Sequence, residues 1–338
     1  MQSLPEGLVS SKPVRPLNAA VRRGGWLRAE EAIMGTSVSV ELWCDERRAG
    51  EAAIAAVMAD MRRIDRTMSP VQAASDLSRI NREAARQAVP LSDEMFALLE
   101  RALSFSRLTD GAFDISYASA GQLYDYREGR APGDAELAAA RAAIGWQQLR
   151  LDPQARTIRF GHPGMRIDLG GFAKGHAVDR GAAILRAHGI AHAVVAAGGD
   201  SHVIGDRRGR PWNIAVRDPR RPGEVVAVLP LEDVAMSTSG DYERYFERDG
   251  VRHHHVIDPK TGRSPGGIRS VTILADDGLT AEGLSKGVFV KGLEEGMRLV
   301  ESQEGVDAIV VDAEGVLHYS SGLLGAAPQA GGNPGRQS

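Results

Sequence analysis

Apolar and polar residues follow two different periods along this chain, and these periods predict a mixture of strands and helices. In SVSVEL, at 37–42, every second residue is apolar, which is typical of a half-buried strand. One helix is predicted from about Ser92, a favourable N-cap, to Leu108, with Gly111 just beyond its end. Another is predicted before it, over 47–66, where apolar residues at helical spacing would form one face: Ile54, Val57, Met58, Met61 and Ile64.

The middle of the chain predicts a strand, a glycine turn and a helix in close succession. The strand would carry apolar residues at alternate positions, namely Met165, Ile167 and Leu169. Gly170 and Gly171 would make the turn, and the helix that follows would end at Gly189. The segment HAVVAAGGD then predicts a buried strand that is closed by glycines.

The second half predicts four more strands, two helices and a closing hairpin. The strands are WNIAV, VVAVLPL, HHVI and SVTILA. Helices are expected over about 280–290 and 293–302, and DAIVVDAEGVLHYSS predicts a hairpin around Glu314 and Gly315. Because strand-rich stretches alternate unevenly with helices, the sequence favours an α+β fold with mixed, largely antiparallel sheets over a doubly wound sheet.

The domain organisation predicted from the sequence is simple. The chain has no internal repeat and no clear linker, so one domain is expected over 26–323. Residues 1–25 would form a disordered N-terminal arm, and the low-complexity residues 324–338 a loose tail.

Composition narrows the class of protein. The chain has 338 residues, of which 43% are hydrophobic and 25% charged, as in an ordinary globular protein. The net charge of -3, with both signs mixed, gives no indication of nucleic acid or an anionic membrane as partner. A single cysteine, Cys44, excludes a disulfide framework, and its place in the strand alternation predicts a thiol in the core or at a strand end.

The sequence leaves the compartment open. A run of about 18 apolar residues is absent, so no transmembrane segment is predicted. The N-terminal residues also lack the apolar stretch of a signal peptide. The protein would act where it is made, or an export signal is missing from this version of the chain.

The segment DLGGFAKG, at 168–175, is the strongest candidate for a ligand-binding site. Gly170 and Gly171 follow an apolar stretch and would let the backbone approach a ligand closely. A helix then starts, so its free N–H groups can face a phosphate. The segment matches neither the GxGxxG nor the Walker pattern. The alternative is a tight turn in which Asp168 and Lys174 form a surface ion pair.

Three further segments each have two interpretations. Gly198-Gly199-Asp200 predicts either a place where backbone meets a ligand or a plain hairpin turn. Ser237 to Gly240 offers hydroxyls and amides for phosphate or ribose, although Ser-rich turns are common. Glu282 and Lys286 are four apart on a predicted helix, the spacing of a surface ion pair.

A histidine triplet precedes the segment VIDPKTG. On a strand, His253 and His255 would share one face and His254 would lie on the other. A zinc site would need more ligands at set spacing, and no cysteine matches. We therefore expect one inward histidine, His255, to orient a loop or handle a proton.

In this order, the motifs resemble those of the ApbE family of FAD:protein FMN transferases over roughly residues 30 to 322. Each motif alone is weak, but the ordered combination is specific. The matching segments are Met34-Gly35-Thr36, Ile64-Asp65, Met68-Ser69, Ser75-Asp76-Leu77, Ile80-Asn81, Gly111 to Asp114, Asp168 to Gly175 with Asp179, Gly198 to Asp200, Thr238 to Gly240, His255 to Gly262 and the helix starting near Ala281.

The resemblance implies a fold, a ligand and a reaction. It implies a single α+β domain of the T-fold-like kind that binds FAD, uses Mg²⁺ and transfers the FMN phosphoryl group to a threonine or serine of a target flavoprotein, releasing AMP. Such chemistry needs a pyrophosphate to be held and neutralised while a hydroxyl attacks phosphorus. Members of the family are typically periplasmic or membrane-anchored. Two alternatives stay open: an FAD-binding protein without transferase activity, and an FAD pyrophosphatase giving FMN and AMP.

The resemblance also implies roles for individual residues. His255 and Asp258 fall where they would position the attacking hydroxyl. A backbone carbonyl near Gly171, with the side chains at 282 and 286, falls on the metal-ligand positions. The cofactor-binding positions are Met34, Ser69, Phe113, Asp114, Asp168, Gly170, Gly171, Lys174, Gly199, Asp200, Thr238, Ser239, Gly240, Val256 and Ile257.

The sequence departs from the pattern of the family in three places. The family usually has Asp where this chain has Glu282, and Thr or Ser where it has Lys286. Mg²⁺ demands near-octahedral geometry, and a charged lysine cannot ligate it. Two outcomes are expected from these changes. In one, the site has lost its metal and Lys286 neutralises the pyrophosphate as a point charge; in the other, Glu282 and Lys286 pair with each other and close the site. After Phe113-Asp114, the family often continues with Pro-Thr rather than Ile115-Ser116, which affects the loop near the adenosine.

Overall fold

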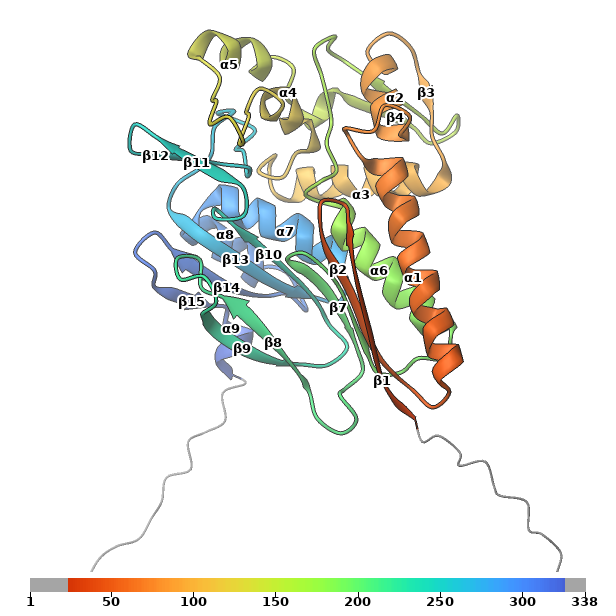
Figure 1. Ribbon diagram of the computed structural model, residues 1–338. Coiled ribbons are helices and arrows are strands. Elements are labelled where there is room, and N and C mark those ends of the chain that lie inside the picture. Colours follow the sequence, from red (N-terminus) through yellow and green to blue (C-terminus); the bar gives the residue numbers. More distant parts are fainter. Residues whose placement is uncertain (1–23, 326–338) are drawn as a thin grey trace, which may run out of the picture.

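An antiparallel sheet of eight strands forms the centre of the molecule (Figure 1). The computed structural model describes residues 24–325, so most of the predicted arm and tail lies outside the described residues. Antiparallel pairing confirms the predicted α+β class with largely antiparallel sheets. In spatial order the strands are β1 (Gly25–Ile33), β2 (Thr36–Cys44), β6 (Ala193–Ala197), β7 (Asp200–Ile204), β10 (Ala235–Gly240), β13 (Ile268–Ala275), β14 (Asp307–Asp312) and β15 (Leu317–Tyr319).

Helices cover one face of this sheet and a two-stranded ribbon covers part of the other. The helices are α1 (Arg47–Met68), α6 (Ala173–Ala187), α7 (Gly278–Lys291) and α8 (Leu293–Glu301) (Figure 1). All five apolar residues predicted on the inner face of α1 are buried. On the opposite face, the ribbon β8 (Trp212–Arg217) and β9 (Val225–Leu231) contributes Trp212 and Leu231 to a second, smaller apolar core. Within residues 24–325, none of the helices is long and apolar enough to span a bilayer.

Smaller elements gather at one end of the sheet (Figure 1). The long helix α3, several short helices and a three-stranded sheet lie there, and a ribbon lies beside them. They are α2 (Asp76–Glu83), β3 (Val89–Pro90), α3 (Asp93–Leu108), η1 (Ile115–Tyr117), α4 (Ala118–Gly121), α5 (Asp134–Arg141), η2 (Trp146–Gln148), β4 (Leu149–Asp152), β5 (Thr157–Phe160), β11 (Tyr245–Arg248) and β12 (Val251–His254). A last short helix, α9 (Ser321–Gly325), closes the described chain. The predicted N-cap of α3 is confirmed, since Ser92 accepts a hydrogen bond from Met95 N.

The prediction of a strand over 165–169 is wrong, because this segment pairs with no other strand. These residues form no regular helix or strand, although their apolar side chains are buried. The side-chain amide of Asn81 takes the place of a neighbouring strand: Nδ2 donates to Ile167 O at 2.9 Å, and Oδ1 accepts from Ile167 N at 2.8 Å. Because a side chain provides the hydrogen bonds of the Ile167 backbone, the alternating apolar pattern shows only that these side chains are buried and not that the segment pairs with a strand.

Two other predictions differ from the structure in register or type. The strand predicted at HHVI instead ends at His254, since β12 spans Val251–His254. Ser237 to Gly240 is not a turn but the last four of the six residues of β10, at the centre of the sheet. Its hydroxyls are tolerated there because they find partners on the neighbouring strand and on α7.

Helices α6 and α7 cross at a contact between two glycines. A Cβ built on Gly175 would lie 2.3 Å from Gly278 O, and one built on Gly278 would lie 2.7 Å from Gly175 O. The Asp179 carboxylate accepts hydrogen bonds from Gly278 N at 2.7 Å and Leu279 N at 3.1 Å. The first turn of α7 is thereby held against the first turns of α6, and side chains from both helices meet there.

We expect Gly175→Ala to destabilise the protein by about 1–3 kcal/mol, because its methyl group would push against the backbone of α7. Urea unfolding measures the change. Gly266→Ala is the matched control, because no atom lies within 4 Å of the position that its methyl group would take. Equal destabilisation by both substitutions would contradict the packing argument.

Candidate active site

Several segments of the predicted site meet at the end of the central sheet that faces the smaller elements. The Met34–Gly35 turn joins β1 to β2, and the turn at Gly198 joins β6 to β7. A Cβ built on Gly198 would lie 2.7 Å from Thr36 Oγ1, so these turns touch. Gly199 O accepts a hydrogen bond from Thr238 N at 2.9 Å, which brings in β10. The structure thus gathers motifs that lie more than 160 residues apart in the sequence.

The first of these turns has an unusual backbone. Met34 has a φ of 54° and Gly35 a φ of 70°. Two positive φ angles suit a tight hairpin between twisted strands, but a non-glycine residue there is strained. Strain of this kind collects at ligand-binding turns, and the half-buried Met34 side chain is one of the predicted cofactor contacts.

Two buried carboxylates and a lysine form the centre of the site. Lys174 Nζ donates to Asp200 Oδ2 at 2.7 Å and also to Glu282 Oε1. Glu282 Oε2 accepts the backbone N–H of Gly175 at 2.7 Å, so both of its oxygens are engaged. The Glu282 side chain is fully buried and that of Asp200 is 2% exposed. Lys286, one helical turn after Glu282, completes what we call the four-residue cluster: Lys174, Asp200, Glu282 and Lys286.

The charges of this group are strongly coupled. Burial alone would lower the pKa of Lys174, but the carboxylates of Asp200 and Glu282 outweigh burial and raise it above its usual value. Burial, together with the nearby Asp200 charge, raises the pKa of Glu282 above its usual value. Lys174 therefore stays protonated and compensates the two acids.

Lys286 has different neighbours from those predicted. Its ammonium group donates to Ser239 Oγ at 2.6 Å, and no carboxylate of the described residues lies within 4.0 Å of it. The ion pair between Glu282 and Lys286 considered above is therefore not formed. Burial lowers the pKa of Lys286, and the Glu282 charge counteracts this only in part.

A chain of hydroxyl groups connects Lys286 to the backbone of its own helix. Ser239 Oγ lies 2.7 Å from Ser285 Oγ, and Ser285 Oγ donates to Glu282 O at 2.9 Å. Ser237 Oγ lies 3.3 Å from the same Ser285 oxygen. Ser237 and Ser239 of β10 therefore both point to α7, while Thr238 points the other way and bonds Thr272 Oγ1 at 2.9 Å.

Asp168 and the glycine pair form a tight turn at the start of α6. The Asp168 carboxylate accepts the N–H of Gly170, and burial raises its pKa although that amide and Arg244 counteract the effect. A Cβ built on Gly171 would lie 3.3 Å from Lys286 Cε, so this turn packs along the lysine side chain. The alternative ion pair is not formed, because Lys174 pairs in the described chain with Asp200 and Glu282 instead of Asp168.

His255 lies just after β12 and has a nitrogen without a partner. The backbone N–H of His255 donates to the backbone carbonyl of Arg244 at 3.0 Å, whereas the ring atom Nδ1 is buried and has no hydrogen-bond partner among residues 24–325. Burial, followed by the positive charge of Lys286 and other nearby cations, lowers the pKa of His255 to about 3. The imidazole is therefore neutral near pH 7.

The rest of the predicted histidine segment has structural contacts. The buried His254 packs edge-on against Phe289, and its Nε2 lies 3.0 Å from Pro265 O. The ring of His253 stacks on Phe246. Val256 and Ile257 are buried, and Asp258 accepts the N–H of Lys260 within a turn, so its carboxylate shapes the loop.

Several residues predicted as cofactor contacts also support the loops around the site. Phe113 lies in the apolar core against Phe105 and Phe172. Asp114 accepts hydrogen bonds from Ser116 N and Oγ and from Trp146 N at 2.7 to 2.8 Å. Ser69 ends α1, and its carbonyl accepts a bond from Ser75 Oγ at 2.6 Å. Gly240 has no room for a side chain, because a Cβ there would lie 2.2 Å from the Tyr242 ring.

Sequence reasoning missed Arg244 and Ser285. Arg244 Nη2 lies 3.4 Å from the Cβ position of Gly35, and its charge affects the pKa of Asp168 and of His255. No pattern distinguishes an exposed arginine in a turn. Ser285 could have been noticed as a polar residue between Glu282 and Lys286 on an otherwise apolar helix.

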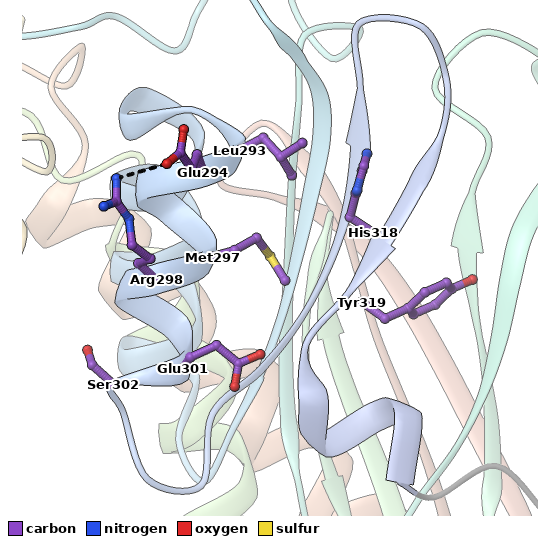
Figure 2. Close-up of a pocket in the computed structure, with 8 residues that line it drawn as sticks. All are labelled: Leu293, Glu294, Met297, Arg298, Glu301, Ser302, His318 and Tyr319. Atoms are coloured by element: carbon purple, nitrogen blue, oxygen red, sulfur yellow. Dashed lines mark ion pairs between the residues drawn. The ribbon is translucent and has the colours of Figure 1, made fainter.

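Two cavities lie near the sheet, and only the smaller one touches the four-residue cluster. It has a volume of about 160 Å³ and is lined by Asp200 of the cluster, by Gly198, Gly199 and Thr238, and by Tyr242 and Glu243. The other, of about 680 Å³, lies between α8 and β15, where Figure 2 shows Leu293, Met297 and Tyr319. None of the predicted site residues lines this larger cavity.

Comparisons with known proteins agree on one family. The model of the ApbE family matches residues 34–310. The FAD:protein FMN transferase of Treponema pallidum is 32% identical over 314 residues, covering 87% of this chain and 86% of that protein. The one from Vibrio cholerae is 35% identical over 262 residues, covering 75% and 78%.

Solved structures resemble the whole described fold. The ApbE protein from Thermotoga maritima has a TM-score of 0.83 at 33% identity, covering 89% of this chain and 98% of its own. The flavin transferase ApbE from Vibrio cholerae has a TM-score of 0.79 at 29% identity, covering 89% and 99%. With a family model over most of its length and relatives aligned over most of theirs, this chain belongs to the ApbE family.

Proposed function

We propose that the protein is an FAD:protein FMN transferase, which moves FMN from FAD to a threonine or serine hydroxyl of a target flavoprotein. The observation that carries the proposal is the four-residue cluster beside the glycine turns, with one ammonium group, that of Lys286, lacking a carboxylate partner among the described residues. Relatives that align along most of the chain are named FAD:protein FMN transferase.

The reaction forms one bond to phosphorus and breaks another. The acceptor oxygen attacks the FMN phosphorus, the bond from that phosphorus to the bridging oxygen breaks, and AMP leaves with the bridging oxygen. The acceptor hydroxyl loses its proton to a base or to solvent. Catalysis of such a transfer consists mainly of positioning and charge neutralisation. Glycines at 170, 171, 198 and 199 let these turns pack closely around the cluster, since a Cβ at each would lie 2.6 to 3.3 Å from a neighbouring protein atom.

Two buried polar atoms can accept a hydrogen bond from the incoming hydroxyl: His255 Nδ1 when the ring carries its proton on Nε2, and a carboxylate oxygen of Asp200. Nδ1 of the neutral His255 and Oδ1 of Asp200 are both buried and have no hydrogen-bond partner among residues 24–325. A buried polar atom without a partner is costly, and a hydroxyl donor would satisfy it. We assign the orientation of the acceptor hydroxyl to His255. Asp258 acts through the shape of the loop that follows.

The residues of the cluster do not fit a magnesium ion. Glu282 uses both oxygens on Lys174 and on the Gly175 amide, and the side chain at 286 is an ammonium group, which cannot ligate a metal. Within residues 24–325, no three His, Cys, Asp or Glu side chains form a group that could hold a metal ion by themselves. The orientation of the acceptor hydroxyl by His255 therefore involves no metal.

Incubation of the protein with FAD and an acceptor domain that carries a flavinylation-type threonine tests the proposal. We expect the acceptor to gain the mass of FMN less one water while AMP is released in equal amount. FMN and AMP without an adduct would indicate a pyrophosphatase instead. Bound FAD with neither product would contradict both enzymatic interpretations and leave an FAD-binding protein.

A further inference from the structure

The lysines of the four-residue cluster are not equivalent. Lys174 contacts both carboxylates, so its charge is compensated within the protein. Lys286 donates one hydrogen bond, to a neutral serine oxygen, and has two further N–H groups. Of the two ammonium groups, Lys286 is therefore the one that still lacks a counter-charge in the described structure.

The position of Lys286 suits an anion at the glycine turn. Its side chain runs along Gly171, with Cε 3.3 Å from the Cβ position of that glycine. Any side chain at 171 would crowd this lysine, so glycine keeps the approach open. The cost of burying the charge falls when an anion arrives, because the attraction between charges is stronger in a partly buried site than in water.

We propose that Lys286 binds the diphosphate of FAD directly and replaces a divalent cation in this role. FAD binding by this chain then needs no metal. The inference rests on the proposed function. A lysine and a divalent cation both supply positive charge to phosphate oxygens, but the lysine is attached to the protein. The neighbouring Glu282 cannot recruit a cation in competition, because Lys174 and the Gly175 amide hold its oxygens.

Equilibrium binding of FAD, followed by flavin fluorescence, tests this inference without any turnover. We expect the same dissociation constant with EDTA as with millimolar Mg²⁺. Lys286→Gln keeps a polar group near Ser239 but removes the charge, and we expect it to weaken FAD binding about 10- to 100-fold. Riboflavin, which has no phosphate, should bind the variant and the unchanged protein equally.

Lys291→Ala is the control, because this lysine lies on the same helix but pairs with Glu295 at 3.5 Å, away from the cluster. It should bind FAD as the unchanged protein does. The double variant Glu282→Asp with Lys286→Thr removes the attached charge and shortens the acid, and its FAD binding should then improve on addition of Mg²⁺. Circular dichroism and the unfolding midpoint establish that each variant is folded.

The possible failures can be told apart. If FAD binds only when Mg²⁺ is present, the inference about Lys286 is overturned and the proposed transferase stands. If Lys286→Gln weakens riboflavin binding as much as FAD binding, the residue acts through the fold and the inference is also wrong. If FAD does not bind under any condition, the proposed function fails and the inference fails with it.

Discussion

Lys174→Ala is expected to destabilise the protein by about 3–5 kcal/mol, because it leaves two buried carboxylates side by side without a cation. Glu282 is fully buried and Asp200 nearly so, so water cannot compensate their charges. Urea unfolding with and without the substitution measures the loss. FAD binding should weaken in parallel, since the same lysine fixes the two elements that form the site.

The loss should depend on pH in a defined direction. Burial already raises the pKa of Glu282 above its ordinary value of 4.5, and removal of Lys174 would raise it further. A carboxyl group whose pKa is higher in the folded state binds protons on folding, so its stability contribution is greatest below the unfolded pKa and is lost as pH rises through the folded pKa. The loss of stability in the variant, relative to the unchanged protein, should therefore be largest near pH 8 and become smaller toward pH 5.

Two further variants control for this result. Lys291→Ala removes a lysine whose partner, Glu295, is exposed, and it should change stability by less than about 1 kcal/mol. Adding Glu282→Gln and Asp200→Asn to Lys174→Ala removes the isolated charges and should recover much of the lost stability. A triple variant no more stable than the single one would show that the charges are not the cause.

His255→Ala is expected to lower the rate of FMN transfer by about 10²- to 10⁴-fold while FAD still binds. The imidazole is the group assigned to the incoming hydroxyl, and FAD binding rests on other residues. Single-turnover transfer and the FAD dissociation constant, measured on the same preparation, separate the two effects. The low pKa of His255 further implies that its protonation does not limit the rate between pH 5 and 8.

His253→Ala is the matched control for this prediction. Its ring stacks on Phe246 in the β11–β12 ribbon, two residues from His255 along the chain. Transfer should be nearly unchanged in this variant. A rate loss of the same size in both variants, or a loss of FAD binding in His255→Ala, would mean that the segment acts only through its fold.

Helices and outer strands could be predicted because their residues obey a local period. The inner face of α1 and the N-cap at Ser92 follow directly from the spacing and chemistry of neighbouring residues. The segment at 165–169 could not be predicted in full, because the backbone of Ile167 is bonded by a side chain 86 positions away, that of Asn81. Local pattern records that a residue is buried, but not which group satisfies its backbone.

The site was predictable in its residue types and less so in its pairings. The resemblance pointed to Lys174, Asp200, Glu282 and Lys286, and the structure gathers all four. Their spacing suggested pairs within one segment, namely Asp168 with Lys174 and Glu282 with Lys286. The actual partners come from different elements, since the α6–α7 crossing and the neighbouring strands β7 and β10 decide which charges meet.

The hydroxyl chain between β10 and α7 has a fixed polarity. An ammonium group can only donate and a carbonyl can only accept, so Lys286 at one end and Glu282 O at the other allow one order of hydrogens: Ser239 donates to Ser285, which donates to the carbonyl. Both hydroxyl dipoles then turn their oxygen ends toward the ammonium group. Two neutral serines thus help to keep the charge of Lys286 in place before any ligand arrives.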